Sequence, residues 1–213
     1  MIKLRVDNLE IEAKEGTNLL QACLDNNIYI PNLCYIRGKE RVTASCRLCF
    51  VEIEGENSPL PSCTMEVREG MVVRTDTQTV RRLQRAALRL LLSVHHVECA
   101  KCPANKRCEL QRLAKVLKVG LKSKTLDKHL KEIEIDETHS ILNYHPNRCV
   151  LCGKCVYICK DKHDKPLLTF ARRGMDTVIS FYGEEDPGSQ DCDECLACVD
   201  ICPVGAITLK GNP

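Results

Sequence analysis

The sequence predicts an α+β protein built from several small domains. Residues 1–16 alternate apolar and polar side chains, which is typical of paired strands, and residues 77–94 repeat apolar side chains at helical spacing. The 213-residue chain also carries 16 cysteines, most of them in four closely spaced groups. We therefore expect small separate domains, each organised around one or two of these cysteine groups.

The composition narrows the class of protein. A chain of this length can build a core without disulfides, and the alternating segment Met1–Val6 is unlike an export signal, so we expect reduced, metal-binding cysteines in the cytoplasm. The 31 basic and 29 acidic residues leave a net charge of +2, which gives no electrostatic basis for binding nucleic acid. No apolar run approaches the ~20 residues of a membrane span. With three Phe, five Tyr and no Trp, something other than side chains must complete the interior.

Residues 1–78 are expected to form the first domain. A hairpin should turn at Asp7-Asn8, and Thr17 is the expected N-cap of a helix that carries an apolar stripe from Leu19 to Leu24 and ends at Asn26-Asn27. Further strands are expected at residues 50–54, 65–68 and 71–74. Strands around one crossover helix make a small α+β domain.

The helix at residues 77–94 has two different faces. One face should be apolar, with Val80, Leu83, Ala87, Leu90, Leu91 and Val94. The other carries Arg81, Arg82, Arg85 and Arg89, which we interpret as a solvated face rather than a docking surface for an acidic partner. Residues 79–120 are expected to form a second, small helical domain, and the charged residues 121–140 a connector.

The third domain, residues 141–213, carries the most specific cysteine pattern. We expect a hairpin of residues 167–170 and 177–182 around Arg173-Gly174. On either side of it the spacing C-x2-C-x2-C-x3-C occurs twice, as Cys149, Cys152, Cys155 and Cys159, and as Cys192, Cys195, Cys198 and Cys202 with Pro203 after it. In two-cluster ferredoxins the fourth cysteine of each run binds the other 4Fe-4S cluster. The expected ligand sets are therefore Cys149, Cys152, Cys155 and Cys202 for one cluster, and Cys192, Cys195, Cys198 and Cys159 for the other.

Zinc and disulfides are the competing interpretations of these two runs. Zinc sites use pairs of x2-spaced cysteines rather than a repeated x2-x2-x3 run, and disulfides do not suit a reducing compartment. The sequence departs from the ferredoxin pattern at Lys160, which stands where a proline is expected after Cys159. Because proline is not a ligand, we expect the cluster to bind and the lysine charge to shift its potential.

The N-terminal cysteines are spaced C-x11-C-x2-C-x13-C, at Cys34, Cys46, Cys49 and Cys63. This pattern resembles the plant-type 2Fe-2S site, whose first gap is normally x4, and it lies in a domain whose layout suits the β-grasp ferredoxin fold. A tetrahedral zinc site remains open as the alternative for the same four cysteines.

The middle domain supplies one cysteine too few for a cluster. Cys99, Cys102 and Cys108 need a fourth ligand, and His95 precedes them in the spacing H-x3-C-x2-C-x5-C. Imidazole is a suitable iron ligand, so we predict a 4Fe-4S cluster held by one histidine and three cysteines, with a potential unlike that of its neighbours. The adjacent His96 is the competing choice. Cys23 belongs to none of the four sets, and its place in the Leu19–Leu24 stripe indicates a small buried side chain.

The order of these motifs resembles that of one family. A C-x11-C-x2-C-x13-C domain is followed by a segment ending Cys108-Glu109-Leu110-Gln111 and by a double-cluster domain containing Arg173-Gly174-Met175-Asp176-Thr177. The same order is similar to the N-terminal third of the large peripheral subunit of respiratory complex I. It is also similar to the accessory region of iron-only hydrogenases and to the small subunit of soluble NAD-linked hydrogenases, formate dehydrogenases and bifurcating complexes. The resemblance implies one 2Fe-2S and three 4Fe-4S clusters that pass electrons from one to the next.

The expected function is electron transfer without catalysis in this chain. No Gly-rich dinucleotide fingerprint appears, and the chain stops at Pro213, soon after Cys202. The resemblance implies a flavin-containing NAD(H)-oxidising partner with a small 2Fe-2S companion, and a second redox site on another chain. That site would belong to a hydrogenase, a formate dehydrogenase or a ferredoxin-linked transhydrogenase.

Two other classes of function stay open. The first is a free-standing polyferredoxin-like carrier, which should be acidic for docking; the nearly balanced charge speaks against it. The second is a zinc-stabilised interaction module in which the cysteine sets are structural staples.

Overall fold

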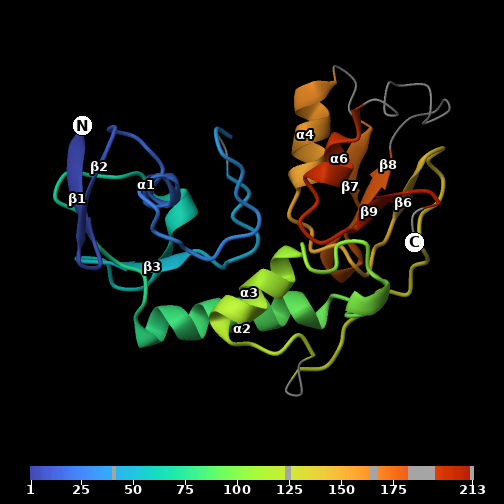
Figure 1. Cartoon of the computed structure of the whole chain (residues 1–213), viewed down its shortest axis with the longest axis horizontal. Helices are drawn as coiled ribbons and strands as arrows, with labels where there is room; N and C mark the ends of the chain where they lie inside the picture. The colour runs from blue at the N-terminus through green and yellow to red at the C-terminus, as the bar shows by residue number, and fades with distance from the viewer. Residues whose placement is uncertain (40–41, 123–125, 164–166, 182–194, 212–213) are drawn as a thin grey trace. The chain divides into compact units, whose positions relative to one another are not determined.

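The computed structural model describes residues 1–39, 42–122, 126–163, 167–181 and 195–211. These residues form two compact units, Met1–Arg89 and Leu90–Pro213, which are described separately below (Figure 1). Mixed strands and helices occur in both, as the α+β prediction expects. Within the described part of the chain, no helix is long and apolar enough to cross a membrane.

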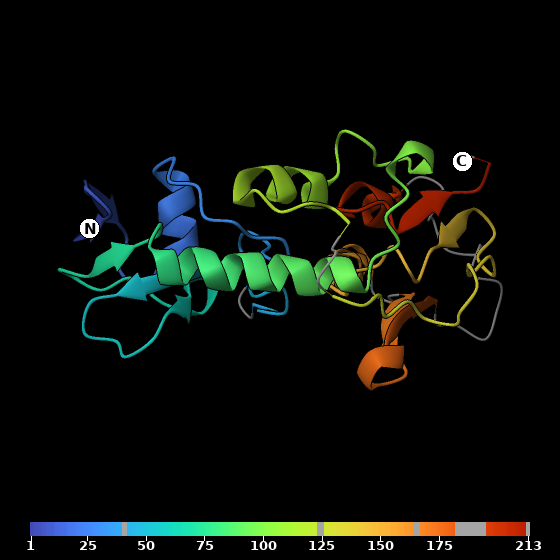
Figure 2. The ribbon, with the colours of Figure 1, turned by 90° about the horizontal axis from the view of Figure 1, so that it is seen from below.

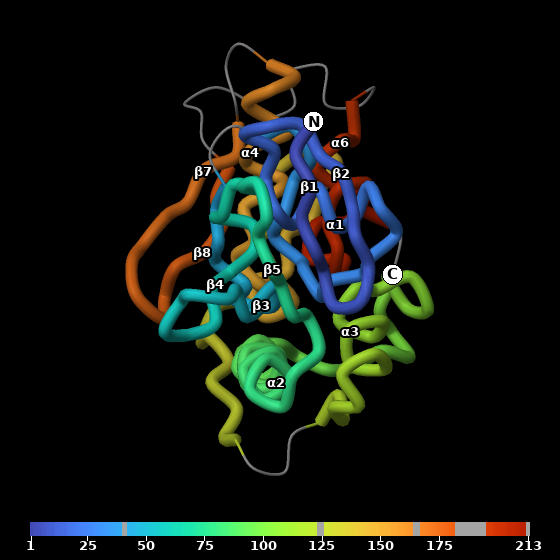
Figure 3. Tube along the Cα trace, turned by 90° about the vertical axis from the view of Figure 1, so that its left-hand side faces the viewer, coloured from blue at the N-terminus to red at the C-terminus, as the bar shows by residue number. Residues whose placement is uncertain are grey.

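Unit 1 is built on a five-stranded sheet with the order β2-β1-β5-β3-β4. Its strands are β1 (Ile2–Val6), β2 (Leu9–Ala13), β3 (Phe50–Ile53), β4 (Leu60–Pro61) and β5 (Val72–Arg74). The expected hairpin is confirmed, because β1 and β2 pair antiparallel from Ile2–Ala13 to Val6–Leu9. Strand alternation buries Leu4, Val6, Ile11 and Ala13. β5 pairs parallel to β1 and antiparallel to β3, as can be followed in Figure 3.

One helix, α1 (Leu19–Asp25), packs its buried residues into this core. It ends at Asn26 as expected, but the prediction of Thr17 as N-cap is wrong, because Asn18 holds that position. The Asn18 side chain accepts the N–H of Gln21 and donates to the carbonyl of Cys63. A cap residue must place its side-chain oxygen over the first turn, and here only the residue directly before Leu19 does so.

Residues 65–68 do not form the expected strand. The chain instead makes a 3-10 turn, η1 (Ser62–Thr64), followed by a single bridge between Asn18 and Glu66. The backbone groups here bond to the segment before α1 instead of to a neighbouring strand. The carbonyl of Met65 accepts the N–H of Leu19 at 2.8 Å, and the N–H of Val67 donates to the carbonyl of Thr17 at 2.9 Å. These bonds hold the Cys63 turn against the start of α1.

The long helix α2 (Gln78–Ser93) confirms the helix expected at 77–94, and Figure 2 shows it as one continuous rod. Its buried residues are Val80, Gln84, Ala87, Leu88, Leu92 and Ser93. The apolar face was predicted wrongly at Leu90, which is 61% exposed. Leu90 follows Leu88 by two positions, which turns it about 200° around the helix axis and away from the buried side.

Unit 2 combines short helices with two small antiparallel sheets. Its elements are η2 (Cys99–Lys101), α3 (Glu109–Leu117), β6 (Leu142–Tyr144), α4 (Lys154–Lys162), β7 (Leu168–Ala171), η3 (Gly174–Asp176), β8 (Val178–Phe181), α6 (Ala197–Asp200) and β9 (Ile207–Leu209). β6 pairs with β9, and β7 with β8, which confirms the expected hairpin. Residues 172–176 at the hairpin tip are exposed. The described residues of 121–140 form no helix or strand.

Replacing Asn18 by alanine should loosen α1 and the Cys63 turn together. Loss of the cap costs about 1 kcal/mol, and loss of the bond to the Cys63 carbonyl adds a similar amount. We expect amide hydrogen exchange of residues 19–25 to become roughly tenfold faster or more, as measured by mass spectrometry. Asn18→Asp keeps the cap acceptor and loses the donor, so its exchange should lie between wild type and Asn18→Ala. Equal exchange in all three proteins would contradict this account.

Candidate iron-sulfur sites

The four N-terminal cysteines come together beside the sheet of unit 1. Cys34 and Cys46 lie in the loop before β3, Cys49 directly precedes that strand, and Cys63 lies in η1. All four are buried. The Sγ atoms of Cys34 and Cys46 are 3.4 Å apart, and the thiols of Cys49 and Cys63 also share a hydrogen bond. Four sulfurs therefore gather as two close pairs.

Hydrogen bonding between the paired thiols favours one thiolate in each pair. The hydrogen bond from Cys46 lowers the pKa of the Cys34 thiol, and the hydrogen bond from Cys63 lowers the pKa of the Cys49 thiol. The backbone supports this arrangement, because the N–H and hydroxyl of Ser62 both donate to the Cys49 carbonyl, at 2.8 and 2.9 Å. Thiolates are the form that binds iron or zinc, so the donor set suits a metal centre.

His95 is buried just after α2, with 8% of its surface exposed. Its Nδ1 lies 2.9 Å from the carbonyl oxygen of Arg148, which can only accept, so Nδ1 carries the hydrogen and Nε2 keeps its lone pair. Burial lowers the pKa of His95 to about 4. A neutral imidazole whose other nitrogen is held by a carbonyl is the usual state of a metal-binding histidine. His96 is by contrast half-exposed and faces Glu98 at 3.6 Å.

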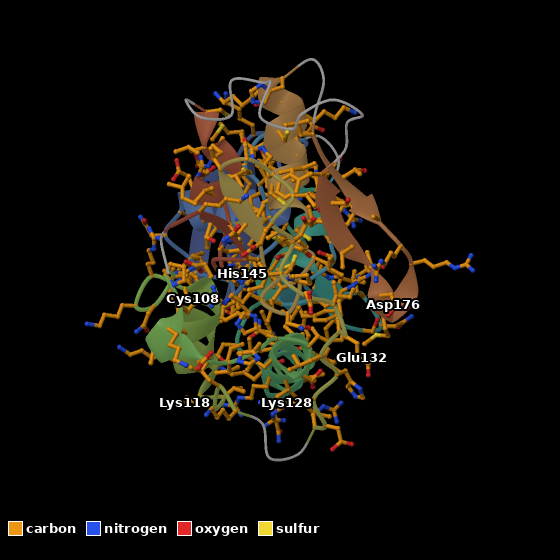
Figure 4. All side chains as sticks on the ribbon, turned by 90° about the vertical axis from the view of Figure 1, so that its right-hand side faces the viewer. Cys108, Lys118, Lys128, Glu132, His145 and Asp176 are labelled. Atoms are coloured by element: carbon orange, nitrogen blue, oxygen red, sulfur yellow. The ribbon has the colours of Figure 1, made fainter. Side chains whose placement is uncertain are left out.

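The three cysteines of the middle set lie around one short loop. Cys99 begins η2, Cys102 follows it, and Cys108, which is labelled in Figure 4, is the residue directly before α3. The backbone N–H groups of Leu110 and Gln111 at the start of α3 hydrogen-bond the Cys108 sulfur. Cys99 and Cys102 are half-buried, whereas Cys108 is buried. The loop thus holds three sulfurs near one another.

The first cavity of unit 2, called the Cys149 cavity here, is lined by Cys149, Cys152, Cys155 and Cys202. These are the four cysteines of the first expected ligand set, three from one run and the fourth from the other. Backbone N–H groups donate to its sulfurs: Leu151 to Cys149 at 3.4 Å and Ala206 to Cys202 at 3.2 Å. The backbone of Lys154 also hydrogen-bonds the Cys152 sulfur. Cys202, which belongs to the second cysteine run, thus completes the lining of the cavity formed by the first run.

The Cys195 cavity is lined by Cys159, Cys195 and Cys198, together with His139, His163 and apolar side chains. Cys192, the fourth member of this expected set, lies outside the described residues. The N–H of Leu167 donates to the Cys159 sulfur at 3.3 Å. Among the residues that the structure describes, no three His, Cys, Asp or Glu side chains converge tightly enough to hold a single metal ion.

The two cavities repeat one local backbone geometry. Cys152 and Cys195 are each followed by a residue with left-handed backbone, Gly153 at φ 73° and Leu196 at φ 41°, and each of these precedes a helix, α4 or α6. A left-handed residue turns the chain sharply, so that the next cysteine faces back toward the same cavity. Glycine adopts this conformation without strain, whereas Leu196 does not.

Hydrogen bonds tie the middle site to the Cys149 cavity at both of its ends. His95 bonds to Arg148, next to Cys149, and the N–H of Glu109 donates to the carbonyl of Pro203 at 2.9 Å, next to Cys202. The two segments of the chain that contain Ala104 and Gly205 also approach closely between these bonds. A Cβ added to Gly205 would lie 2.8 Å from the Cβ of Ala104.

Sequence reasoning missed two side chains that contact the cysteine sulfurs. Tyr144 lines the Cys149 cavity and hydrogen-bonds Cys149, and Nε2 of His163 lies 3.3 Å from the Cys195 sulfur. Nothing local in the sequence distinguishes Tyr144 from an ordinary core residue. Cys23 is fully buried in the core of unit 1, as expected, and burial raises its pKa to about 12.

Comparison with protein families identifies three segments of the chain. Residues 1–78 match a 2Fe-2S iron-sulfur cluster binding domain, and residues 84–121 match the NADH-ubiquinone oxidoreductase-G iron-sulfur binding region. Residues 140–208 match the ferredoxin-like domain of NADH-quinone oxidoreductase subunit 3. Binding domains for 2Fe-2S and 4Fe-4S clusters are therefore present, as predicted.

Similar proteins extend along almost the full chain. An NADH-quinone oxidoreductase subunit of Rhizobium meliloti is 33% identical over 211 residues, or 97% of this chain and 24% of the relative. An NADP-reducing hydrogenase subunit of Solidesulfovibrio fructosivorans is 32% identical, over 97% of this chain and 36% of its own length. The chain thus spans about a quarter to a third of these curated relatives. In a crystal structure of NAD+-reducing [NiFe]-hydrogenase in the H2-reduced state, one chain aligns with a TM-score of 0.86 at 29% identity, covering 99% of this chain and 88% of that one.

Burial of His95 predicts how the iron-free chain responds to acid. Its pKa is about 4 when folded and about 6.5 when exposed, so the unfolded chain binds a proton more readily between these values. The stability contributed by neutral His95 is therefore complete above pH 6.5 and falls, by an amount on the order of 3 kcal/mol, toward pH 4. Imidazole 15N NMR should show His95 protonated on Nδ1 and neutral at pH 5.5. A midpoint near 6.5, or protonation on Nε2, would contradict the assignment.

Proposed function

The chain resembles, along nearly its whole length, the iron-sulfur subunits of NADH-quinone oxidoreductases and NAD(P)-reducing hydrogenases, and from this we propose that it relays single electrons within such a complex. The Cys149 cavity is the observation that supports this most directly. One run of cysteines contributes three sulfurs and the other contributes one, which is the arrangement of two-cluster ferredoxins. We assign Cys149, Cys152, Cys155 and Cys202 to one 4Fe-4S cluster and Cys192, Cys195, Cys198 and Cys159 to the other.

Two further clusters complete the proposal. In unit 1, which we propose to be a β-grasp ferredoxin domain, Cys34 and Cys46 would hold one iron of a 2Fe-2S cluster, and Cys49 and Cys63 the other. The 3.4 Å between the first two sulfurs supports this pairing, because two thiolates on one tetrahedral metal lie roughly 3.8 Å apart at bonds of about 2.3 Å. His95, Cys99, Cys102 and Cys108 would hold the third 4Fe-4S cluster, giving one 2Fe-2S and three 4Fe-4S clusters.

The clusters would supply the chemistry, which is one-electron transfer without bond making or breaking. The chain's own residues hold the metal, keep water away from it and fix the spacing between sites. The bonds that His95 and Glu109 make beside the Cys149 cavity support a direct step between the middle cluster and its neighbour. No general acid, base or nucleophile is required, so we propose that the chain itself is not catalytic.

The proposed partners are a flavin-containing NAD(H)-oxidising subunit, its small 2Fe-2S companion and a separate catalytic subunit or ferredoxin. Relatives named as subunits of NADH-quinone oxidoreductase and NADP-reducing hydrogenase support this kind of assembly. Reduced cysteines are needed to bind iron, which supports the cytoplasm as the place of action. Nucleic acid remains outside the proposal because the net charge is only +2.

Metal analysis tests this function directly. The chain purified without oxygen should be brown and hold about 14 irons, from one 2Fe-2S and three 4Fe-4S clusters. Reduction should produce distinct paramagnetic signals from the two cluster types. A colourless protein with zinc would instead support the interaction module, and the same iron content without any binding to an NAD(H)-oxidising subunit would support the free-standing carrier. Cys102→Ala should lose about four irons and keep the other signals.

Exchanging the middle-site histidine should change one potential and leave the iron content intact. His95→Cys replaces a neutral ligand by a thiolate, and the added negative charge should lower the potential of one 4Fe-4S cluster. His96→Cys is the matched control, because His96 is half-exposed and faces Glu98. Redox titration followed by paramagnetic resonance measures both. If His96→Cys moves the potential instead, His95 is not the ligand.

A further inference from the structure

Tyr144 lies at the Cys149 cavity and has no part in the roles assigned above. It is the last residue of β6, it is 2% exposed, and it lines the cavity with the four cysteines. Its ring packs within unit 2 beside Ile179 of β8 and Ile207 of β9, which line the same cavity. The phenol is therefore held in place from several elements.

Two hydrogen bonds fix the direction of the Tyr144 hydroxyl. The backbone N–H of Ile179 donates to the Tyr144 oxygen at 3.1 Å. The same hydroxyl is hydrogen-bonded to the sulfur of Cys149. Because the oxygen accepts from Ile179, its own hydrogen is the one that points to Cys149. A phenol has an ordinary pKa of about 10, so that hydrogen stays on the Tyr144 oxygen at neutral pH.

The other hydrogen bonds to sulfur described at this cavity come from the backbone. Leu151 donates to Cys149 and Ala206 donates to Cys202, at 3.4 and 3.2 Å. Such donors are available at every position of the chain, whereas a phenol is specific to this sequence. The Cys195 cavity has a different side chain in the equivalent role, since Nε2 of His163 lies 3.3 Å from the Cys195 sulfur. A different side chain thus contacts a cysteine sulfur in each cavity: Tyr144 in one and His163 in the other.

We propose that Tyr144 sets the reduction potential of the cluster in the Cys149 cavity by donating its hydroxyl hydrogen to Cys149. This rests on the proposed iron-sulfur function. On reduction the cluster gains one electron, no bond forms or breaks, and the hydrogen stays on the phenol. The added negative charge spreads onto the cysteine sulfurs, so a hydrogen bond to sulfur stabilises the reduced cluster more than the oxidised one. Tyr144 therefore raises the potential, and is a positioning residue rather than a ligand.

Tyr144→Phe in the full-length chain removes the hydroxyl and keeps the ring. Iron content should stay at the wild-type level, while the equilibrium constant for reducing one 4Fe-4S cluster should fall about tenfold, which corresponds to ~59 mV for one electron. The readout is an anaerobic titration with dithionite followed by paramagnetic resonance. The relevant signal is the one that changes in Cys152→Ser, because Cys152 lines this cavity.

Tyr35→Phe is the matched control. Its hydroxyl donates to the Gln21 side chain at 2.7 Å in unit 1, so the same substitution there should leave all 4Fe-4S potentials unchanged. A Tyr144→Phe protein with full iron content and unshifted or raised potentials would overturn the proposal. A wild-type chain without iron-sulfur clusters would instead overturn the proposed function, so the two failures are distinguishable.

A second variant covers the case in which Tyr144→Phe does not retain its cluster. Replacing Tyr144 by 3,5-difluorotyrosine keeps the ring and the hydroxyl but makes the phenol a stronger hydrogen-bond donor. The potential of the same cluster should then rise, opposite in sign to the effect of phenylalanine. An unchanged or lowered potential in this variant would overturn the proposal without reference to Tyr144→Phe.

Discussion

A shortage of aromatic side chains shapes the interior of the protein. The chain has three Phe, five Tyr and no Trp, and of the Phe and Tyr side chains that the structure describes Tyr144 alone is buried. Cysteine takes up much of the interior instead: Cys23, Cys49 and Cys63 belong to the core of unit 1, and the cysteines of unit 2 line its cavities. A core of this kind gains little from burial alone, since a thiol is small. Metal binding to such cysteines would couple directly to folding.

Backbone hydrogen bonds reach several of the cysteine sulfurs. The N–H groups of Leu151, Leu167 and Ala206 each donate to a sulfur, and the start of α3 does the same for Cys108. These donors come from loops and helix starts that the cysteine spacing itself creates. A short spacing therefore brings the sulfurs together and also supplies the dipoles that stabilise them as thiolates. Tyr144 and His163 add a contribution that the spacing alone does not provide.

Local patterns in the sequence predicted the local structure well. Alternation gave the β1–β2 hairpin and helical spacing gave α2, because both follow from the geometry of neighbouring residues. The errors at Thr17 and residues 65–68 arise where a distant part of the chain decides the outcome: the bonds between residues 17–19 and 65–67 set both the cap and the missing strand. The error at Leu90 is one of helical phase, since Leu90 lies two positions after the buried Leu88. Cysteine spacing indicated which sulfurs belong together. The contact of Tyr144 with Cys149 could not be predicted, since it depends on the pairing of β6 with β9 and on a bond to Ile179 in β8. The ligand sets themselves stay predictions.

The close approach of Gly205 to Ala104 has a consequence for how such proteins can be rearranged. Only a residue without a Cβ fits at position 205, where the backbone also has φ 65°. The loop of Cys102 and Cys108 is thereby seated directly on the segment that follows Cys202, between the bonds of His95 and Glu109. The two segments match separate family models, but this contact couples the packing of one to that of the other. If either segment were exchanged for that of a related protein, the new segment would have to keep a glycine at position 205 or a small residue at position 104. We therefore expect the two segments to be inherited together.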